Sequence, residues 1–350
     1  TAVESWGVKD HSLEENALDV SNRLDFVFMS TWNIVGMYQP DAIANYTVNG
    51  TNYLVIANEG DARDYDGFSE ESRTNDLTLD PTAYPNADII QIDENLGRLN
   101  VTTATGDTDG DGDIDIIHAY GGRSFSIVNA DTRAIVYDSQ NILERIIKED
   151  PVYGAIFNAT NDENNFKNRS DDKGPEPEAV IVQQIGDQWY AFIGLERIGG
   201  IAVFNVTDPT APTFETYVNN RDTTLDVENP DGDLAPEGVI YIAPEDNATE
   251  MGLIVVANEV SSTIAVYSLA NDTLNIEEFT IEDHIITVYP NPTSDGNLFF
   301  SEQTGYEMYD MVGRKVASSP LASQVHIETM STGMYIIKFS NGTAQKVLIK

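Results

Sequence analysis

The sequence predicts an all-β protein with two parts, a β-propeller over residues 1–280 and a small antiparallel β-sandwich over residues 285–350. Two observations favour this fold class. Short runs rich in Val, Ile, Tyr and Phe alternate with Asn, Asp, Gly and Pro, which is typical of strands joined by turns. The runs in the first part also recur as copies of one unit, and units of several strands repeated around an axis form a propeller.

The repeated unit begins with a proline, an acid, a small residue and an apolar residue. Its starts lie at residues 40–43, 177–180 and 236–239, and each is followed by an apolar strand that ends in Glu59, Glu196 or Glu259. A third strand follows at residues 201–204 and 264–267, and residues 125–128 are interpreted as the same strand in a further copy. About four blades are therefore expected, which is the lower limit for a closed propeller.

One convincing helical pattern interrupts the strands. In residues 141–148, four apolar side chains fall on one face at spacings of three and four residues. They are Ile142, Leu143, Ile146 and Ile147. We expect this helix to lie in a loop between blades.

Charge separates the two parts of the chain. Residues 285–350 contain five acidic and five basic residues, so the formal charge of -39 belongs to residues 1–284. Such an acidic surface repels nucleic acid and anionic membranes and attracts divalent cations, so no nucleic-acid role is expected. No apolar run approaches the 18 residues that a transmembrane helix needs.

The composition argues against several kinds of catalysis. The chain has no cysteine and four histidines, and it contains no Gly-x-Ser-x-Gly elbow, phosphate loop or zinc helix. Disulfides and thiolate metal sites are therefore excluded. Any catalysis would have to use metal and carboxylate chemistry.

The sharpest chemical motif is an acidic loop at residues 107–115. Calcium takes six to eight oxygen ligands, which acids at alternating positions around a glycine turn supply. The predicted side-chain ligands are Asp107, Asp109, Asp111 and Asp115, with Asp113 binding through its carbonyl. His118 stands where an EF-hand has glutamate, so the loop is closer to the shorter dockerin- or integrin-type loops. We expect structural calcium, and the alternative is a solvated acidic turn without metal.

The acids of the repeats form a second candidate site. In a propeller the first strand of each blade lines the central channel, so equivalent side chains converge near the axis. The channel candidates are Asp41, Glu178 and Glu237 at the strand starts, and Glu59, Glu196 and Glu259 at the strand ends. They predict a site for a metal ion or a cationic ligand. The alternative is that these acids accept backbone hydrogen bonds and join neighbouring blades.

Three arginines complete the candidate channel. Arg63, Arg123 and Arg197 stand within or beside the recurring motifs of an arginine-poor body. Guanidinium groups suit phosphate or carboxylate ligands because they donate two parallel hydrogen bonds. The alternative is that each arginine pairs with a neighbouring acid.

The body resembles the choice-of-anchor I family. The residues that carry the resemblance are 36–43 (GMYQPDAI), 57–65 (ANEGDARDY), 121–127 (GGRSFSI), 173–178 (KGPEPE) and 195–201 (LERIGGI). The resemblance implies a secreted bacterial propeller, in a family of which some members are labelled alkaline phosphatase. The family carries further blades ahead of the matched region, so we expect an N-terminally incomplete chain.

The last part of the chain resembles the C-terminal sorting domain of the type IX secretion system. The matching residues are 288–293 (VYPNPT), 309–315 (YDMVGRK), 332–338 (TGMYIIK) and 346–350 (KVLIK). The resemblance implies export across the outer membrane of a Bacteroidetes-type bacterium by that machinery. It also implies a secreted or outer-membrane-surface location and attachment to surface lipopolysaccharide after sorting. The joint with the body is expected near residues 281–284.

Two functions follow from these observations. The first is a calcium-binding propeller at the cell surface that acts as a ligand-binding or adhesion module. The alternative is a metal-dependent phosphoesterase of the alkaline phosphatase or phytase type.

Overall fold

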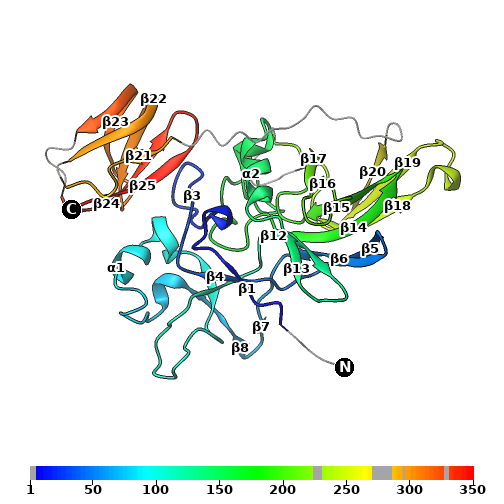
Figure 1. Cartoon of the computed structure of the whole chain (residues 1–350), viewed down its shortest axis with the longest axis horizontal. Coiled ribbons are helices and arrows are strands. Elements are labelled where there is room, and N and C mark those ends of the chain that lie inside the picture. Colours follow the sequence, from blue (N-terminus) through cyan, green and yellow to red (C-terminus); the bar gives the residue numbers. More distant parts are fainter. Residues whose placement is uncertain (1–4, 224–230, 270–285, 295, 327–330) are drawn as a thin grey trace.

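The structure is a computed structural model that describes residues 5–223, 231–269, 286–294, 296–326 and 331–350 (Figure 1). Within these residues strands predominate and helices are few and short. The predicted all-β class is therefore confirmed.

Three antiparallel sheets of the body share one arrangement, in which the strands of each sheet follow one another across it. The first consists of β5 (Ile43–Val48), β6 (Thr51–Asn58), β12 (Ser124–Asn129) and β13 (Ile135–Asp138). The second consists of β14 (Pro177–Ile185), β15 (Gln188–Leu195), β16 (Ile201–Asn205) and β17 (Thr213–Val218). The third consists of β18 (Pro236–Ile242), β19 (Gly252–Asn258) and β20 (Thr263–Leu269). Strand β14 packs against both β5 and β18, so the first strands of the three units are neighbours (Figure 1).

The structure corrects the count of repeated units. Phe125 was expected in a further copy, but its strand β12 pairs with β6 along its whole length and is the third strand of the first unit. Residues 59–123 are therefore a long insertion between the second and third strands of that unit. The described residues contain three such units rather than about four.

The insertion and the N-terminal segment form a sheet of a different kind. Its order is β1 (Val8–Asp10), β4 (Val35–Met37), β11 (His118–Tyr120), β10 (Asn100–Thr102) and β9 (Glu71–Arg73). Strands β4 and β11 are parallel, whereas the other pairs are antiparallel. Two short ribbons accompany it, β2 (Leu18–Asp19) with β3 (Met29–Ser30) and β7 (Asp64–Tyr65) with β8 (Phe68–Ser69). The sequence patterns did not predict this mixed sheet.

Helix α2 (Ile142–Glu149) confirms the predicted helical stretch and lies between β13 and β14. It buries Leu143, Ile146 and Ile147 against the core shared by the first two sheets. The other helical segments are α1 (Ala87–Ile90) and single turns at Glu14–Asn16, Thr74–Asp76, Asp93–Gly97, Tyr153–Ile156 and Pro244–Asp246. None of the helices in the described part of the chain is long and apolar enough to span a membrane.

The C-terminal residues form one connected antiparallel sheet. Its strands are β21 (Val288–Tyr289), β22 (Asn297–Asp310), β23 (Lys315–His326), β24 (Gly333–Phe339) and β25 (Ala344–Ile349). The long strand β22 pairs with β21, β23 and β24, and its register shifts at several points along β23. The sheet encloses an apolar core of its own. The joint expected at residues 281–284 lies outside the described residues.

Buried ion pairs connect the N-terminal segment to the rest of the body. Lys167 lies 3.0 Å from Asp19, and each side chain is 1% exposed. Lys9 lies 2.9 Å from Asp138. Arg123, which pairs with Glu144 at 2.9 Å, donates a hydrogen bond to the carbonyl of Asp19. Because a buried charge that loses its partner is strongly destabilising, these pairs fix how the segments fit together.

Candidate functional site

The three repeat acids occupy equivalent places at the starts of the first strands. Asp41 lies two residues before β5, while Glu178 and Glu237 are the second residues of β14 and β18. Two residues before each acid, a non-glycine residue adopts a left-handed backbone conformation. These residues are Gln39 (φ 39°), Glu176 (φ 52°) and Ala235 (φ 61°). This conformation is uncommon outside glycine and costs energy, so its recurrence supports the matched register of the units.

The backbone at the end of each second strand is hydrogen-bonded to the left-handed residue that precedes the first strand. The amide of Glu196 donates to the carbonyl of Glu176, and the amide of Glu259 donates to the carbonyl of Ala235, both at 2.8 Å. In the first unit the equivalent bond runs from the amide of Gly60 to Gln39, next to Glu59. The end of each second strand is thus held beside the start of its first strand.

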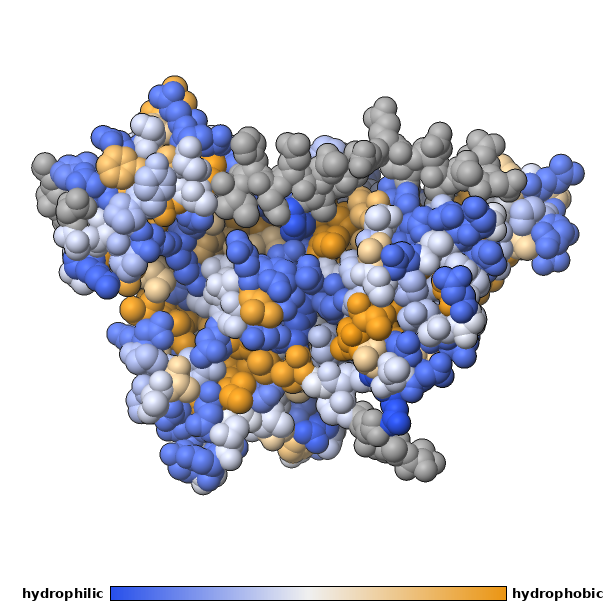
Figure 2. All heavy atoms as spheres, in the orientation of Figure 1, coloured by the Kyte–Doolittle hydropathy of each residue, from blue (hydrophilic) through white to orange (hydrophobic). Residues whose placement is uncertain are grey.

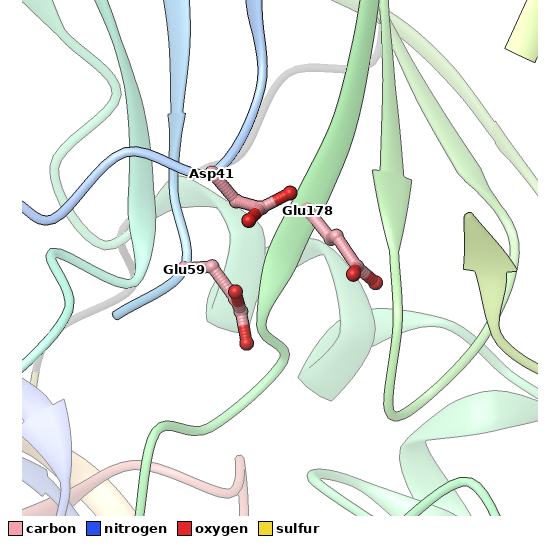
Figure 3. Close-up of side chains that lie close together, drawn as sticks. All are labelled: Asp41, Glu59 and Glu178. Atoms are coloured by element: carbon pink, nitrogen blue, oxygen red, sulfur yellow. The ribbon is translucent and has the colours of Figure 1, made fainter. Parts of the chain in front are cut away.

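These turns bring carboxylates from two sheets together. Oxygen atoms of Asp41, Glu59 and Glu178 lie within 4.8 Å of one another, and Figure 3 shows the three side chains close together. A second group with the same spacing contains Glu59, Glu176 and Glu196. Because Glu59 belongs to both groups, they form one acidic centre. Glu259 is exposed and belongs to neither group.

Glu176 lies on the buried side of this centre and pairs with three cationic side chains. Its fully buried carboxylate lies 2.6 Å from Arg169, 2.9 Å from Lys173 and 3.1 Å from Arg197. Burial acts to raise the pKa of Glu176, but these three cations together hold it below its ordinary value. Glu176 is therefore an anion that anchors the cationic side chains.

The remaining carboxylates of the centre carry an excess of negative charge. Burial, and then the charges of Glu196, Glu237 and Glu59, raise the pKa of Glu178 to about 9. Burial also raises the pKa of Glu196 to about 7, against the opposing charge of Arg197. Such shifts arise where carboxylates share a site, because a second negative charge there is unfavourable.

The cations do not reach every carboxylate. Lys173 pairs with Glu59 at 2.7 Å, but among the described residues no lysine or arginine pairs with Asp41, Glu178 or Glu237. The buried Oε2 atom of Glu178 has no donor in the same set, and a hydrogen bond between Glu178 and Glu237 would require a proton on one of the two carboxyls. Carboxylate oxygens at this spacing are ligands suited to a hard divalent cation.

A close backbone contact fixes the position of Glu59. A Cβ atom on Gly60 would lie 2.1 Å from the amide nitrogen of Gly121, and one on Gly121 would lie 2.0 Å from the carbonyl oxygen of Glu59. Both glycines also have positive φ angles, of 90° and 73°. Glycine is required at both positions because a side chain at either would force the two segments apart.

The three candidate arginines have different roles. Arg197 lies at the centre, with its guanidinium on Glu176 and Glu196. Arg123 is 4% exposed, and its guanidinium donates to Glu144 and to the carbonyls of Asp19, Ser170 and Asp172, so it positions the segment that leads to Lys173. Arg63 is exposed and pairs with Glu70. Neighbouring acids thus engage all three, as the alternative interpretation held.

The acidic loop lies between β10 and β11. Carboxylate oxygens of Asp107, Asp109 and Asp115 lie within 4.8 Å of one another, as do those of Asp80, Asp113 and Asp115. Asp107 accepts hydrogen bonds from the amides of Gly110 and Gly112, which curl the loop. Asp111 belongs to neither group and instead accepts a bond from the amide of Asp113. Burial and the charges of Asp111 and Asp80 raise the pKa of Asp113.

Sequence reasoning missed several residues of both sites. Glu176 and Lys173 lie within the stretch 173–178, where the doubled Pro-Glu pattern was a usable signal. Arg169 has no comparable signal. Asp80 is far from the loop in sequence and reaches it because the amide of Asp80 donates to the carbonyl of Ile114.

Comparison with known protein families first defines the class of exported protein to which this chain belongs. Residues 287–350 match the secretion system C-terminal sorting domain. The protein is therefore a β-rich protein that the type IX secretion machinery exports to the cell surface or the medium, and its sorting domain implies interaction with that machinery.

Residues 1–209 match the choice-of-anchor I domain, and the chain belongs to the choice-of-anchor I family. It is also similar to Gigasin-3a of Magallana gigas, with 32% identity over 190 residues. That alignment covers 51% of this chain and 66% of the relative, so the chain spans only part of the relative's length.

Proposed function

We propose that this exported protein is a calcium-dependent ligand-binding module whose acidic centre holds the cation. The observation that carries the proposal is the approach of Asp41, Glu59 and Glu178 within 4.8 Å across two sheets. A bound divalent cation would offset the burial and the mutual repulsion that together raise the pKa of Glu178. Calcium suits the centre because it accepts many carboxylate oxygens in flexible geometry.

The position of the centre supports a binding role. Asp41 and Glu237 are exposed, while Glu176 and Glu196 are buried. A cation held between them would be covered on the inner side and would offer free coordination positions on the outer side. An anionic group of a surface ligand could complete its coordination. We further propose that the three units are consecutive blades of a propeller and that the centre lies at their common axis.

We propose a second, structural calcium in the loop of residues 107–115. The grouping of Asp107, Asp109 and Asp115 supports it, and Asp80 and Asp113 extend the set of available oxygens. The loop is anchored to a second segment through the bond between Asp80 and Ile114. A cation there would stabilise the long insertion of the first unit.

Glu178→Gln is expected to affect stability and binding in opposite directions. The folded-state pKa of Glu178, about 9, lies above the ordinary value of 4.5, so its contribution to stability is complete below pH 4.5 and is lost as the pH rises through 9. The neutral amide avoids this loss. We therefore expect calcium-free stability at pH 8 to rise by about 1 kcal/mol, less than the full shift implies because the side chain is partly solvated.

The same variant is expected to bind one calcium ion fewer than the parent protein, as measured by titration calorimetry. Glu259→Gln is the control, because Glu259 is also a repeat acid, at the end of the second strand of the third unit, but is exposed and outside the acidic groups. Unchanged stoichiometry in Glu178→Gln would remove the centre from the list of cation sites.

A phosphoesterase is the second candidate function. Lys173 and Arg197 lie beside the carboxylates, and a metal ion with neighbouring cations is the arrangement that stabilises a transferring phosphoryl group. Hydrolysis of p-nitrophenyl phosphate, with calcium and with a chelator, separates the two functions. Turnover that requires calcium and is lost in Glu178→Gln would favour the enzyme.

A further inference from the structure

The C-terminal sheet packs against the body through a shared apolar cluster. Tyr309 of β22 and Ile336 of β24 are 8% and 1% exposed. They belong to the same cluster as Phe26, Phe28 and Trp32 of the N-terminal segment. The rings of Phe26 and Tyr309 lie 5.5 Å apart. Figure 2 shows apolar residues at the seam below the C-terminal sheet, and other apolar patches lie elsewhere on the same face.

Two lysines of the C-terminal sheet lie over aromatic rings of the body. The ammonium of Lys346 in β25 is 3.1 Å from the ring centroid of Trp32 and 5.8 Å from that of Phe28. The ammonium of Lys338 in β24 is 4.6 Å from the ring centroid of Phe26. Lys346 also donates a hydrogen bond of 3.4 Å to the carbonyl of Thr31. Each contact joins residues of the C-terminal sheet to the segment 26–32.

Both lysine ammonium groups lie on the faces of aromatic rings. Among the described residues no acid forms an ion pair with either lysine, although Lys338 lies opposite Glu307 across β22 and β24. The negative face of an aromatic ring attracts a cation, and most strongly where water is excluded. Burial lowers the pKa of Lys346 to about 7, whereas the face of Trp32 favours its charged form. The close approach to the ring leads us to assign the charged form to the docked state.

We propose that the sorting domain, residues 287–350, docks on the body through a lysine–aromatic latch in which Lys346 binds Trp32 and Lys338 binds Phe26. The docked domain covers an aromatic surface that its removal would expose. A partner that bound the sorting domain through the Lys338 and Lys346 face would have to compete with the body. The latch does not depend on the proposed cation site.

The test uses the full chain with a protease site inserted after residue 277 and cut after folding. We expect the two pieces to co-elute in size-exclusion chromatography at micromolar concentration. Lys346→Met keeps the apolar stem and removes the charge, and we expect it to weaken the association at least tenfold. Lys338→Ala with Lys346→Met should separate the pieces completely.

Lys350→Ala is the matched control, because it removes one charge from the exposed end of the same sheet. It should leave the association unchanged. Immediate separation of the parent pieces would overturn the docking, provided that both retain the far-ultraviolet circular dichroism of the uncut protein. Association of Lys346→Met at parental strength would overturn the latch, since apolar packing alone would then hold the domain.

Discussion

Replacing Lys167 by methionine is expected to destabilise the folded protein by about 3–5 kcal/mol. The side chains of Lys167 and Asp19 are each 1% exposed and lie 3.0 Å apart, and the ammonium also donates to the carbonyl of Phe26 at 2.7 Å. Methionine fills the same space but leaves the carboxylate buried without its cation. Denaturation with guanidinium chloride, followed by circular dichroism, measures the loss.

Two further variants test the cause of that loss. Lys167→Met combined with Asp19→Asn should recover part of the stability, because the amide oxygen still accepts the hydrogen bond from the amide of Phe28 without a buried charge. Arg23→Met breaks an exposed pair with Asp93 and should cost less than about 1 kcal/mol. A loss for Lys167→Met no larger than that of Arg23→Met would show that the buried pair is not important.

Removal of calcium is expected to destabilise the protein by about 3 kcal/mol, relative to calcium at a hundredfold excess over its dissociation constant. The effect arises because only the folded loop brings Asp107, Asp109 and Asp115 together. Differential scanning calorimetry with calcium and with a chelator measures it as a fall in melting temperature.

Asp109→Ala should abolish the loop's share of that dependence and leave the share of the acidic centre, because Asp109 supplies one of the carboxylates grouped in the loop. Asp187→Asn removes a charge from an exposed turn between β14 and β15 and serves as the control. If Asp109→Ala melts with the same calcium dependence as the parent, the loop is a solvated acidic turn.

The local patterns predicted the repeated units well. The same start and the same apolar second strand recur around Asp41, Glu178 and Glu237, and the structure places all three at equivalent strand starts. The assignment of Phe125 failed because β12 pairs with β6 across the whole insertion of residues 59–123. Tertiary contacts set such a long-range pairing, and local periodicity contains no information about it.

The cationic partners of the site were harder to predict from the sequence than its carboxylates. The left-handed turn at Glu176 aims its side chain at three cations, and no propensity favours that conformation for glutamate. The contacts of the latch could not be predicted either, because Lys338 and Lys346 are single lysines in strand sequences, and nothing local indicates which ring each one contacts.

The central claim is that Asp41, Glu59 and Glu178 bind a divalent cation, and anomalous diffraction tests it most directly. Crystals of the full chain would be grown with terbium in place of calcium. We expect an anomalous peak between these three carboxylates that persists in Asp109→Ala and disappears in Glu178→Gln. Anomalous density confined to the loop of residues 107–115, with only the Lys173 ammonium on the carboxylates of the centre, would contradict the account.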